Sequence, residues 1–562
     1  MRWNGFTLRS INMSNKPPNF IYMNNLRIFA AATVTLIPTL AIAVDKSTPT
    51  KPNFVVILLD DSGFADFGCY GGLIPTPNID ALAEKGVRMS QMYNCARSCP
   101  TRASLLTGLY PQQAGVGHMV GSDKGKISSA YQGYLNNNCV TLGEVMRENG
   151  YYTAMVGKWH VGQNQGATPW GRGFDHVLNA AAGGFYYEND PKAEIYLNGE
   201  KIEKGDLRFK KDWYSTDLWT EYANQFISEA AEKRQPFMVY LAYNAPHFPL
   251  QAPVEDVVQF KGKFSKGWDV LRREAYERQL KMNLLGKPYA LTKRSPLIPL
   301  WKDVEVAQRK RSLFTMELYA AIMSHLDTSI GKLVTELKKK DLFEHTVIVI
   351  LSDNGGNAEG KSVFGTFEGS NPGGWESNIF LGQAWAEVSN TPFFLYKHHT
   401  HEGGIATPLV VSYPAGIDHK MNGKIVHQPG HVIDIMATLV EMSSATYPKT
   451  YKGNDIIPMQ GINLYPIWMG EKPVRSEPLF WEHEDNVALR DGRWKIVKER
   501  NEPDWQLYDM EADRTECNDL AQAKPDVLGE MMKKYEKMYD KVGATHINFG
   551  KAPRWMVPVK EY

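Results

Sequence analysis

Ser98 and Arg102 enclose the most informative stretch of the chain, Ser-Cys-Pro-Thr-Arg. Pro100 suits the first turn of a helix, where its missing amide hydrogen has no partner to lose, and Gly108 is a residue type that ends helices. The spacing therefore predicts a helix whose N-terminus points at Ser98. Free amides and the helix dipole favour a negative group such as sulfate or phosphate there. Taken alone, the five residues fit an ordinary helix that starts with proline equally well.

Two pairs of oxygen-bearing side chains follow apolar runs elsewhere in the chain, Asp60-Asp61 and Asp353-Asn354. Adjacent carboxylates are costly at a strand end unless a positive charge lies nearby. Carboxylate and amide oxygens suit a hard cation, and calcium accepts such a mixed set, whereas zinc would require His or Cys. The pairs predict a calcium site. The alternative for Asp60-Asp61 is two ordinary acids that cap a loop.

These pairs belong to a recurring design in which an apolar segment ends in a polar cluster. Nearly continuous apolar runs are typical of buried parallel strands. Ligands of open α/β sheets bind outside the carboxyl ends of the strands, so we expect clusters that are distant in sequence to meet at one edge. The segments and clusters are 53–59 with Asp60-Asp61, 151–156 with Gly157-Lys158-Trp159-His160, 236–243 with Asn244-Ala245-Pro246-His247, and 346–351 with Ser352-Asp353-Asn354.

Helical apolar stripes separate these segments, at 79–87, 218–226 and 313–337. Alternating strands and helices predict an α/β fold with a large, mostly parallel sheet that is covered by helices. Residues 251–312 interrupt the alternation with a basic insertion, and residues 356–392 form a loop long enough to shape a pocket.

The chain changes character after a helical stretch at 432–441. Asp491-Gly492 predicts a hairpin turn, and we expect an amphipathic helix at 525–541 to cover a small antiparallel sheet. We predict a large α/β domain over 52–445 and a smaller C-terminal antiparallel α+β subdomain over 460–562. The expected strands of that subdomain are 478–481, 487–490, 494–497 and 505–508.

Charge and cysteine content restrict the classes of partner. The 562 residues include 63 Lys and Arg against 62 Asp and Glu, and this balance gives no field that would attract nucleic acid. The five cysteines lack metal-binding spacing and do not form a dense disulfide framework. We therefore assign no cysteine to a cofactor.

The N-terminus predicts export. From Met23, a short polar start with Arg27 precedes an apolar run at 28–42, and Ala41-Ile42-Ala43 is a small-residue cleavage signal. A signal peptide over residues 1–43 would leave a mature protein in the periplasm, with the cell surface or secretion as alternatives. No later stretch is expected to span a membrane.

Taken in order, these motifs resemble those of type I sulfatases, the formylglycine-dependent branch of the alkaline phosphatase superfamily. The resemblance extends from about residue 52 to about residue 545 and implies an alkaline-phosphatase-like fold and a sulfuric ester hydrolase. The motifs are Leu-Leu-Asp60-Asp61, Ser98-Cys-Pro-Thr-Arg102-Ala-Ser-Leu-Leu-Thr-Gly, Gly-Lys158-Trp-His160, Pro-His247, Ser-Asp353-Asn354-Gly-Gly and Lys397-His-His-Thr-His-Glu402-Gly-Gly.

The resemblance implies that Ser98 becomes formylglycine (3-oxoalanine), because only this register leaves a proline two places on. Asp60, Asp61, Asp353 and Asn354 would bind Ca²⁺ together with the modified Ser98. The aldehyde would be hydrated to a diol, of which one oxygen attacks sulfur; the sulfated hemiacetal then collapses, releases sulfate and regenerates the aldehyde. Most sulfatases have cysteine at this position, so the serine implies a serine-type radical-SAM maturase as a partner.

Further roles follow from the resemblance and from charge. A lone Lys or Arg is more often solvated, and a lone His is often structural. We reject a zinc site at His398, His399 and His401 because the family uses the preceding lysine and needs no histidine cluster there. The implied roles are neutralisation of sulfate oxygens by Lys158 and Lys397, stabilisation of the diol by Arg102, protonation of the leaving group by His247, and deprotonation of the diol by His160.

The substrate is suggested by two segments, 382–397 and Gly267-Trp268, which are similar to a bacterial branch of arylsulfatase-like enzymes that act on sulfated glycans. This similarity implies an exo-acting sulfatase with terminal galactose 3-O-sulfate as its substrate. The alternatives are another sugar specificity, a phosphodiesterase or phosphonate hydrolase of the same superfamily, and an inactive glycan-binding homologue. Loops that could reach the sugar carry Tyr186, Tyr187, Trp375, Glu376, Glu482 and His483.

Overall fold

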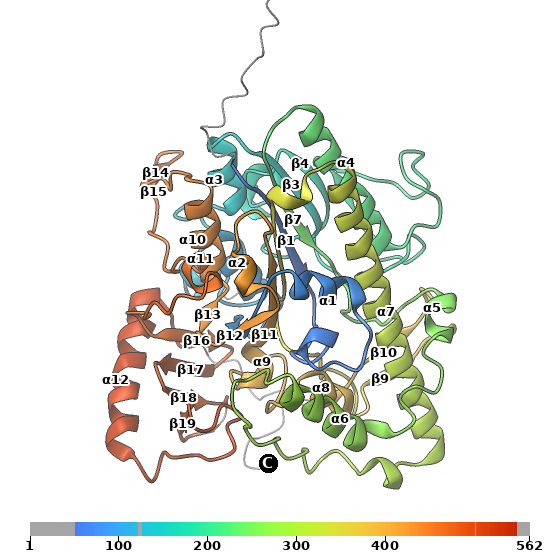
Figure 1. Cartoon of the computed structure of the whole chain (residues 1–562), viewed down its shortest axis with the longest axis vertical. Helices are drawn as coiled ribbons and strands as arrows, with labels where there is room; N and C mark the ends of the chain where they lie inside the picture. Colours follow the sequence, from blue (N-terminus) through green and yellow to red (C-terminus); the bar gives the residue numbers. More distant parts are fainter. Residues whose placement is uncertain (1–50, 122–125, 501, 548–562) are drawn as a thin grey trace, which may run out of the picture. The chain divides into compact units, whose positions relative to one another are not determined.

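Strand β1 (Asn53–Leu59) lies at the centre of the fold beside β7 (Phe237–Ala242), as Figure 1 shows. It runs parallel to β7 on one side and to β8 (Thr346–Ser352) on the other. The computed structural model describes residues 51–121, 126–500 and 502–547. All seven residues of β1 are buried, as expected for an apolar strand that is covered on both faces. The predicted central strand is therefore confirmed.

Eleven strands form the central sheet, which is parallel around β1 and mixed towards its edges. Besides β1, β7 and β8 they are β2 (Val87–Tyr93), β3 (Tyr152–Lys158), β4 (His176–Ala180), β5 (Tyr196–Leu197), β6 (Glu200–Lys201), β11 (Ala406–Ser412), β12 (Lys424–Val426) and β13 (Gly430–His431). The order is β12-β2-β11-β8-β1-β7-β3-β4-β5-β6, and β13 also pairs with β2. Strand β11 is antiparallel to both of its neighbours.

Side chains of β1 alternate between two hydrophobic cores, as the two-residue period of a strand requires. Val55, Ile57 and Leu59 face the core that is closed by α1 (Pro77–Glu84), α4 (Ser215–Glu232) and α7 (Val306–Lys339). Phe54, Val56 and Leu58 face the core that is closed by α2 (Ser98–Thr107), α3 (Leu142–Glu148) and α10 (Ile433–Met442). The predicted sheet with helices on both faces is thereby confirmed.

A separate four-stranded antiparallel sheet follows in the C-terminal part. Helix α12 (Pro525–Val542) packs on it, and the chain turns after Asp491 as the sequence predicted. The division of the chain into 52–445 and 460–562 stays a prediction. The strands are β16 (Leu479–His483), β17 (Asn486–Asp491), β18 (Trp494–Lys498) and β19 (Gln506–Asp509).

The two segments that interrupt the predicted alternation contain elements of their own. Residues 251–312 include α5 (Val254–Val258) and α6 (Gly267–Lys281), and residues 356–392 include a two-stranded sheet and a helix. The latter are β9 (Thr366–Glu368), β10 (Asn378–Phe380) and α8 (Gln383–Ser389). The remaining short elements are α9 (Glu402–Ile405), α11 (Tyr465–Trp468), β14 (Thr450–Tyr451) and β15 (Asn454–Asp455).

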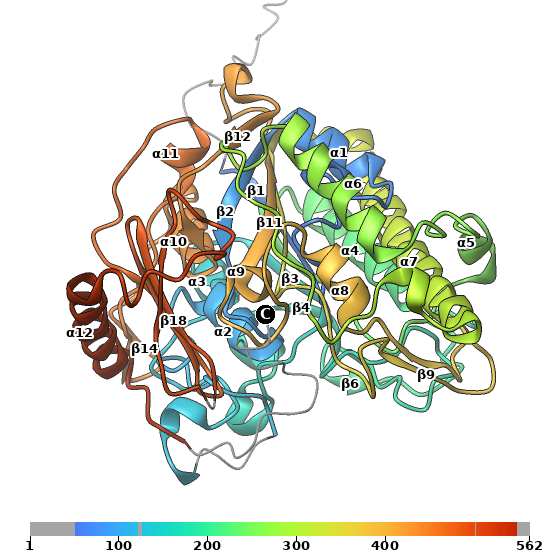
Figure 2. The same ribbon diagram turned by 90° about the horizontal axis from the view of Figure 1, so that it is seen from below.

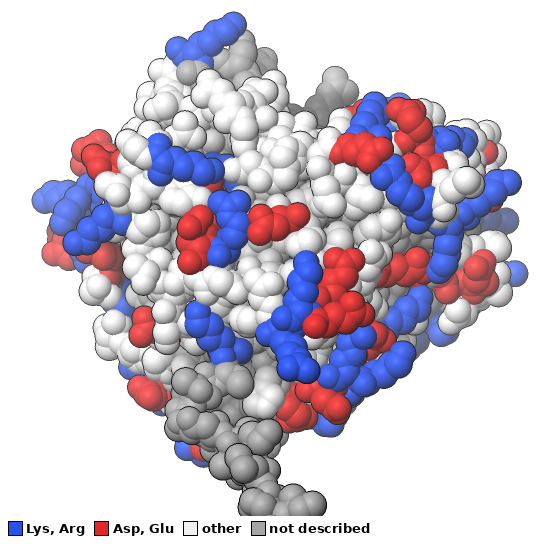
Figure 3. Space-filling view, turned by 90° about the horizontal axis from the view of Figure 1, so that it is seen from above, with Lys and Arg blue, Asp and Glu red and all other residues white. Residues whose placement is uncertain are grey.

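The face seen in Figure 3 mixes Lys and Arg with Asp and Glu, and neither sign dominates it. Among the helices of the described residues, none has the length and apolarity that crossing a bilayer requires. The predicted signal peptide over residues 1–43 lies outside the described residues. All five cysteines are free thiols.

A histidine ion pair joins three helices on the α7 side of the sheet. His325 of α7 lies 3.0 Å from Asp217 of α4 and 2.7 Å from Asp256 of α5. Burial lowers the pKa of the imidazole, but the two carboxylates outweigh this effect and raise the pKa of His325 to about 9. Because the folded-state pKa lies above the unfolded value, the stabilisation is complete below about pH 6.5 and is lost as the pH rises through 9.

Replacing His325 by glutamine should therefore cost a pH-dependent free energy of unfolding. We expect a loss of roughly 2 kcal/mol at pH 6 that shrinks towards zero above pH 9, because wild type loses the same charge there. Thermal melting of wild type and His325→Gln from pH 6 to 10 measures the difference. A difference in melting temperature that does not change with pH would contradict the role of the charged imidazole.

Candidate functional site

The ends of three neighbouring strands are hydrogen-bonded to one another beyond the sheet. The amide of Asp60 donates to the carbonyl of Ala245 at 3.0 Å, and the amide of Asp353 donates to the carbonyl of Leu59 at 3.0 Å. The amide of Asp61 reaches the Asp353 carboxylate at 3.3 Å. Figure 2 views the molecule from below, where α2, α8 and α9 lie around this end of the sheet. The strand ends therefore deliver their polar residues to one place, as predicted.

Ser98 is the first residue of α2, and Gly108 ends the helix with a positive φ of 68°. The Ser98 hydroxyl lies 2.9 Å from a carboxylate oxygen of Asp60 and also hydrogen-bonds to Asp353. Ser98 is buried together with both carboxylates. The predicted helix is confirmed, and its N-terminus meets the strand ends.

Three cations neutralise three buried carboxylates around Ser98. Arg102 Nη2 lies 2.8 Å from Asp353, Lys158 Nζ lies 2.5 Å from Asp60, and Lys397 Nζ lies 2.8 Å from Asp61. All six side chains are buried. Formal charge is thus balanced in the protein alone, so any further cation would leave the site positive and attractive to an anion.

The local charges shift the pKa values of Asp60 and Asp353 in opposite directions. Burial raises the pKa of Asp60, but the charges of Lys158, His247 and Arg102 outweigh burial and hold that pKa well below its usual range. For Asp353, burial and the nearby Asp60 raise the pKa, and Arg102 compensates only in part. A hydrogen bond from Ser98 bridges the two carboxylates, so the hydroxyl sits between a carboxylate that stays ionised and one that protonates more readily.

Two amide side chains complete the oxygen-rich cluster. Asn354 donates to Asp61 at 2.7 Å, and its side-chain oxygen is buried with no hydrogen-bond partner among the described residues. Asn357 donates to the other oxygen of Asp61 at 2.7 Å. Buried amide oxygens are normally paired, so the free oxygen of Asn354 beside three carboxylates fits a hard cation such as calcium.

Two histidines border the site. His247 Nδ1 lies 2.6 Å from the carbonyl oxygen of Phe248, so this nitrogen carries hydrogen, and Nε2 faces Asp61 at 3.7 Å. Burial lowers the pKa of His247, and Asp61 and Asp60 oppose that shift. Burial and the charges of Lys158 and Arg102 lower the pKa of His160 well below its usual value. Both imidazoles therefore favour the neutral form in the absence of bound ions.

The loop that carries Lys397 is held by the C-terminal sheet. Glu499, which follows β18, accepts hydrogen bonds from His399 at 2.7 Å and from His401 at 2.8 Å. His398 instead contacts Glu359 at 2.9 Å. His398 therefore has a different partner from the other two histidines, which are both oriented by one carboxylate about 100 residues away in sequence.

Glycine permits the close approach of this loop to the end of β8. The amide of Gly355 donates to the carbonyl of Gly404 at 3.0 Å. A Cβ atom at Gly355 would lie 1.9 Å from the carbonyl oxygen of Gly403, a distance that no side chain could occupy. The Gly-Gly pairs after Asn354 and after Glu402 therefore allow the end of β8 and the loop that carries Lys397 to approach each other closely.

The residues predicted to reach a sugar lie in different places. Tyr186 is fully buried, and its hydroxyl donates to the carbonyl of His247 at 2.9 Å, beneath the catalytic candidates. Tyr187 forms an isolated bridge with Tyr214. Trp375 is 38% exposed in the loop before β10, where Glu376 accepts a hydrogen bond from Asn371 at 3.2 Å.

Glu482 and His483 lie on β16 and are buried. Glu482 accepts hydrogen bonds from Gln112 and Tyr131 at 2.7 Å each, and burial raises its pKa to about 7. Burial lowers the pKa of His483 to about 3. Its Nε2 lies 3.6 Å from Glu484, which belongs to a charged cluster next to Ser98.

That charged cluster escaped the sequence analysis. Arg97, directly before Ser98, lies 3.5 Å from Glu484 and 3.7 Å from Glu359, and Glu359 lies 3.6 Å from Lys397. Glu484 is held inward by a turn in which it and Asp485 both have positive φ, a strained conformation for such residues. The sequence feature that could have indicated part of this cluster is the run of polar residues after Asp353-Asn354, which includes Asn357 and Glu359.

Comparisons with known proteins match nearly the whole described chain. The Sulfatase family matches residues 52–444, and the family described as N-sulphoglucosamine sulphohydrolase, C-terminal, matches residues 393–541. An arylsulfatase of Klebsiella aerogenes is 35% identical over 78% of this chain and 96% of its own length. An uncharacterized sulfatase of Schizosaccharomyces pombe is 32% identical over 86% of this chain and 92% of its own. A crystal structure of Ps i-CgsB in complex with k-i-k-neocarrahexaose has 26% identity, covers 87% of this chain and 92% of that chain, and superposes with a TM-score of 0.64.

Proposed function

This chain belongs to the sulfatase family and is a sulfuric ester hydrolase, and we propose that it removes sulfate from a carbohydrate through a formylglycine made from Ser98. The observation that carries this proposal is the position of the Ser98 hydroxyl. It lies at a helix N-terminus between two buried carboxylates and is surrounded by three cations. An anion that reaches Ser98 would meet free amides and positive charge together.

We propose that the residues at the strand ends hold calcium. The ligands would be carboxylate oxygens of Asp60, Asp61 and Asp353, the side-chain oxygen of Asn354, and residue 98. The donor set is all oxygen, and the buried Asn354 oxygen has no partner among the described residues. When bound, Ca²⁺ would supply two positive charges to a site that is otherwise balanced, and this suits a sulfate group.

The cationic side chains would receive the sulfate oxygens. Lys158 Nζ lies 3.5 Å from the Ser98 hydroxyl, close enough to contact a group bonded to that oxygen. Lys397 is oriented towards Asp61, with its Nζ 2.8 Å from the carboxylate. Arg102 donates to Asp353 and to the carbonyl of Lys158, which fixes both partners next to residue 98. Preorganised charges of this kind stabilise a transition state without reorganising.

Formylglycine would supply a hydrated aldehyde, of which one hydroxyl oxygen bonds to sulfur and the other, after losing its proton, expels sulfate. His247 would protonate the leaving sugar oxygen from Nε2, which faces the site. Because Nδ1 already donates to the carbonyl of Phe248, this step needs the imidazolium form, which the negative charge of a bound sulfate ester would favour. His160 would accept the proton of the second hydroxyl. Its low pKa keeps the imidazole neutral and therefore able to accept a proton.

We propose terminal galactose 3-O-sulfate as the substrate and exo-action as the mode. The similarity of the segment 382–397 to enzymes that act on sulfated glycans supports a sugar. So do the N-sulphoglucosamine sulphohydrolase match and the carrahexaose bound to Ps i-CgsB. The cluster of Arg97, Glu359 and Glu484 adjoins residue 98 and offers both donors and acceptors for sugar hydroxyls. Trp375 is the candidate for contact with a sugar ring.

A panel of substrates tests this proposal. We expect sulfate release from terminal galactose 3-O-sulfate at a higher kcat/KM than from galactose 6-O-sulfate or from a simple aryl sulfate, because the charged cluster would engage the sugar hydroxyls. Equal values for all three would remove the sugar assignment. If the protein hydrolysed phosphodiesters or phosphonates and released no sulfate from any substrate, it would be a phosphodiesterase or phosphonate hydrolase and the proposed reaction would be wrong.

Maturation and location complete the proposal. Because residue 98 is serine, conversion would need a serine-type radical-SAM maturase, which is the one protein partner that we propose. Export to the periplasm, to the cell surface or out of the cell rests on the signal in residues 1–43. Modification would take place before or during export, while the segment around Ser98 is still unfolded.

Glu499 offers a test of how Lys397 is positioned. Burial raises the pKa of Glu499, but His399 and His401 hold it below its usual range, so this carboxylate is charged and orients both rings. We expect Glu499→Gln to lower kcat about tenfold with a small change in KM, because Lys397 would be misplaced in the transition state. Steady-state kinetics measure this split. Glu530→Gln on the exposed face of α12 is the control, and equal kinetics of the two variants would contradict the positioning role.

A further inference from the structure

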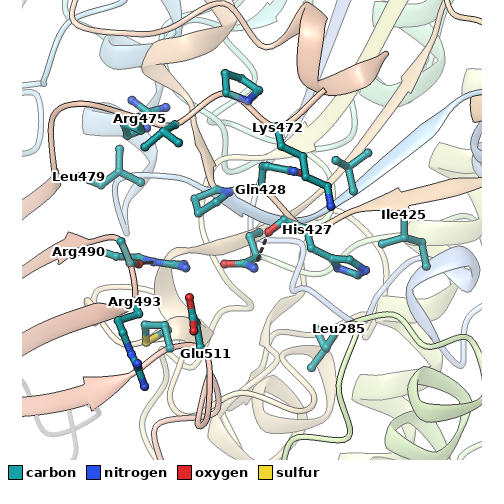
Figure 4. A pocket seen from close by; sticks show the side chains of 18 of the residues that line it. Leu285, Ile425, His427, Gln428, Lys472, Arg475, Leu479, Arg490, Arg493 and Glu511 are labelled. Carbon is teal, nitrogen blue, oxygen red and sulfur yellow. Dashed lines mark hydrogen bonds between the residues drawn. The ribbon is translucent and has the colours of Figure 1, made fainter. Parts of the chain in front are cut away.

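A pocket of about 810 Å³ lies apart from the site described above, between the edge of the central sheet and the C-terminal sheet. Figure 4 shows Ile425, His427 and Gln428 on the side of β12, and Arg490, Arg493 and Glu511 on the other side. None of the residues that line it is a proposed catalytic or calcium-binding residue. Its size is in the range of small-ligand sites.

The pocket is lined by more positive than negative charge. Two of its acidic residues are neutralised by cations outside the lining: Asp491 pairs with Lys534 at 2.5 Å and Glu477 with Lys541 at 3.3 Å. Glu511 is the one acid of the lining with no ion pair among the described residues. The cations of the lining with no ion pair among the described residues are Lys287, Lys424, Lys472 and Arg490. This excess stands out in a chain whose formal net charge is +1.

Arg490 is the strongest indication of an anionic ligand. It is only 6% exposed, yet its hydrogen bonds go to neutral acceptors, the hydroxyl of Tyr93 and the carbonyl of Gly492. Behind it, Lys495 and Arg514 already neutralise Glu402, and Lys495 also contacts Glu516. A buried guanidinium without a carboxylate partner is costly, and an anion in the pocket would remove that cost. Figure 4 shows the Arg490 side chain directed into the pocket.

The rest of the lining suits a sugar. Leu285, Ile425 and Leu479 provide apolar surface for the carbon-bound faces of a ring. Gln91 also lines the pocket, where its side-chain amide donates to the carbonyl of His427 at 2.6 Å and so fixes the start of the segment after β12.

We propose that this pocket is a second binding site for a sulfated saccharide, separate from the site of hydrolysis. The inference rests on the proposed function, which makes sulfated glycans the molecules that this protein meets. A second site would hold one part of a polymeric glycan while a chain end is processed at residue 98. Two linked contacts raise the effective concentration of the reacting end without any change in the chemistry.

Binding by the full chain in a Ser98→Ala background tests the proposal without turnover. The probes are a short dextran sulfate, neutral dextran of the same length, and inorganic sulfate, each titrated by calorimetry at two salt concentrations. We expect Lys424→Ala/Lys472→Ala to weaken dextran sulfate binding about tenfold, because two charges that face the pocket are lost. Lys261→Ala/Lys310→Ala, two exposed lysines outside the pocket, is the matched control and should bind as the parent does.

Equal dextran sulfate affinity in the pocket variant and the control would overturn the proposal. It would also be overturned if inorganic sulfate bound as tightly as the sulfated saccharide, because a small anion would then be the occupant. The pocket variant should hydrolyse a simple aryl sulfate with unchanged kcat/KM, which separates the two sites. If no sulfate ester is hydrolysed by any form while the difference in affinity persists, the proposed function fails and the pocket assignment stands.

Discussion

Ser98→Ala is expected to lower sulfate release by about 10⁴-fold or more, with little loss of folded protein. The alanine can be neither oxidised to the aldehyde nor bonded to sulfur, so the covalent route is closed. Removing a nucleophile typically costs this much, because the remaining site only binds and polarises the substrate. Initial rates of sulfate release by wild type and variant, made with the same maturase, measure the effect. Thermal melting of both proteins checks that the fold is kept.

Cys99→Ala is the matched control for this change. Cys99 is buried and adjacent to Ser98, but it stands at the variable position of the motif, and the hydrogen bonds to Asp60 and Asp353 come from the Ser98 hydroxyl. We expect the activity of the Cys99→Ala variant to remain within about tenfold of wild type, because the substitution changes only local packing. If Cys99→Ala lost activity and Ser98→Ala kept it, Cys99 would be the reacting residue and our assignment of Ser98 would be wrong.

Glu402→Gln is expected to lower the free energy of unfolding by about 3–5 kcal/mol, because it breaks a fully buried ion pair. Glu402 lies 3.0 Å from Lys495 and 3.1 Å from Arg514, and its side chain and that of Lys495 are fully buried. In the variant, buried Arg514 loses its carboxylate partner and buried Lys495 keeps only Glu516. Because Glu402 belongs to α9 and Lys495 to β18, the pair also joins the central fold to the C-terminal sheet.

A double-mutant cycle separates the pair from its surroundings. Lys495→Met should be similarly costly. Glu402→Gln/Lys495→Met should cost clearly less than the sum, because each single variant leaves one of the two charges without the other and the double variant removes both. Urea unfolding of the four proteins gives the coupling. The partly exposed surface pair Glu336 and Lys340, 3.3 Å apart, is the control and should contribute less than about 1 kcal/mol. Additive losses at Glu402 and Lys495 would contradict the account.

The positions of the main site residues could be predicted from the sequence, because the end of each central strand is marked by a change from apolar to polar residues. A run of buried apolar residues such as 53–59 is recognisable locally, and the polar residues after it must lie at the carboxyl edge of a parallel sheet. Asp60, Asp353 and Lys158 therefore could be expected to converge, and the structure brings them within hydrogen-bond distance of Ser98 or of one another. The short strands of the C-terminal sheet could also be predicted, from alternating apolar and polar residues and from the turn residues between them.

Loop paths could not be predicted in the same way. Glu499 lies about 100 residues after His399, and nothing in its own segment indicates that two histidines will meet it. Arg97 and Glu484 become neighbours only because a strained turn after β16 folds inward beside α2. Tyr186 and Glu482 looked available for a sugar, but each is buried with protein partners for its polar atoms. Long-range pairing of this kind depends on tertiary packing, which local patterns do not encode.

The most direct test of the central claim is mass spectrometry of the peptide that contains residues 94–102, from protein made with a serine-type maturase, paired with sulfate release from 3-O-sulfated galactosides. We predict a loss of about two mass units at Ser98, the two hydrogens removed when a primary alcohol becomes an aldehyde, together with sulfate release that rises with the fraction converted. Full activity in protein whose Ser98 is unmodified would contradict the mechanism.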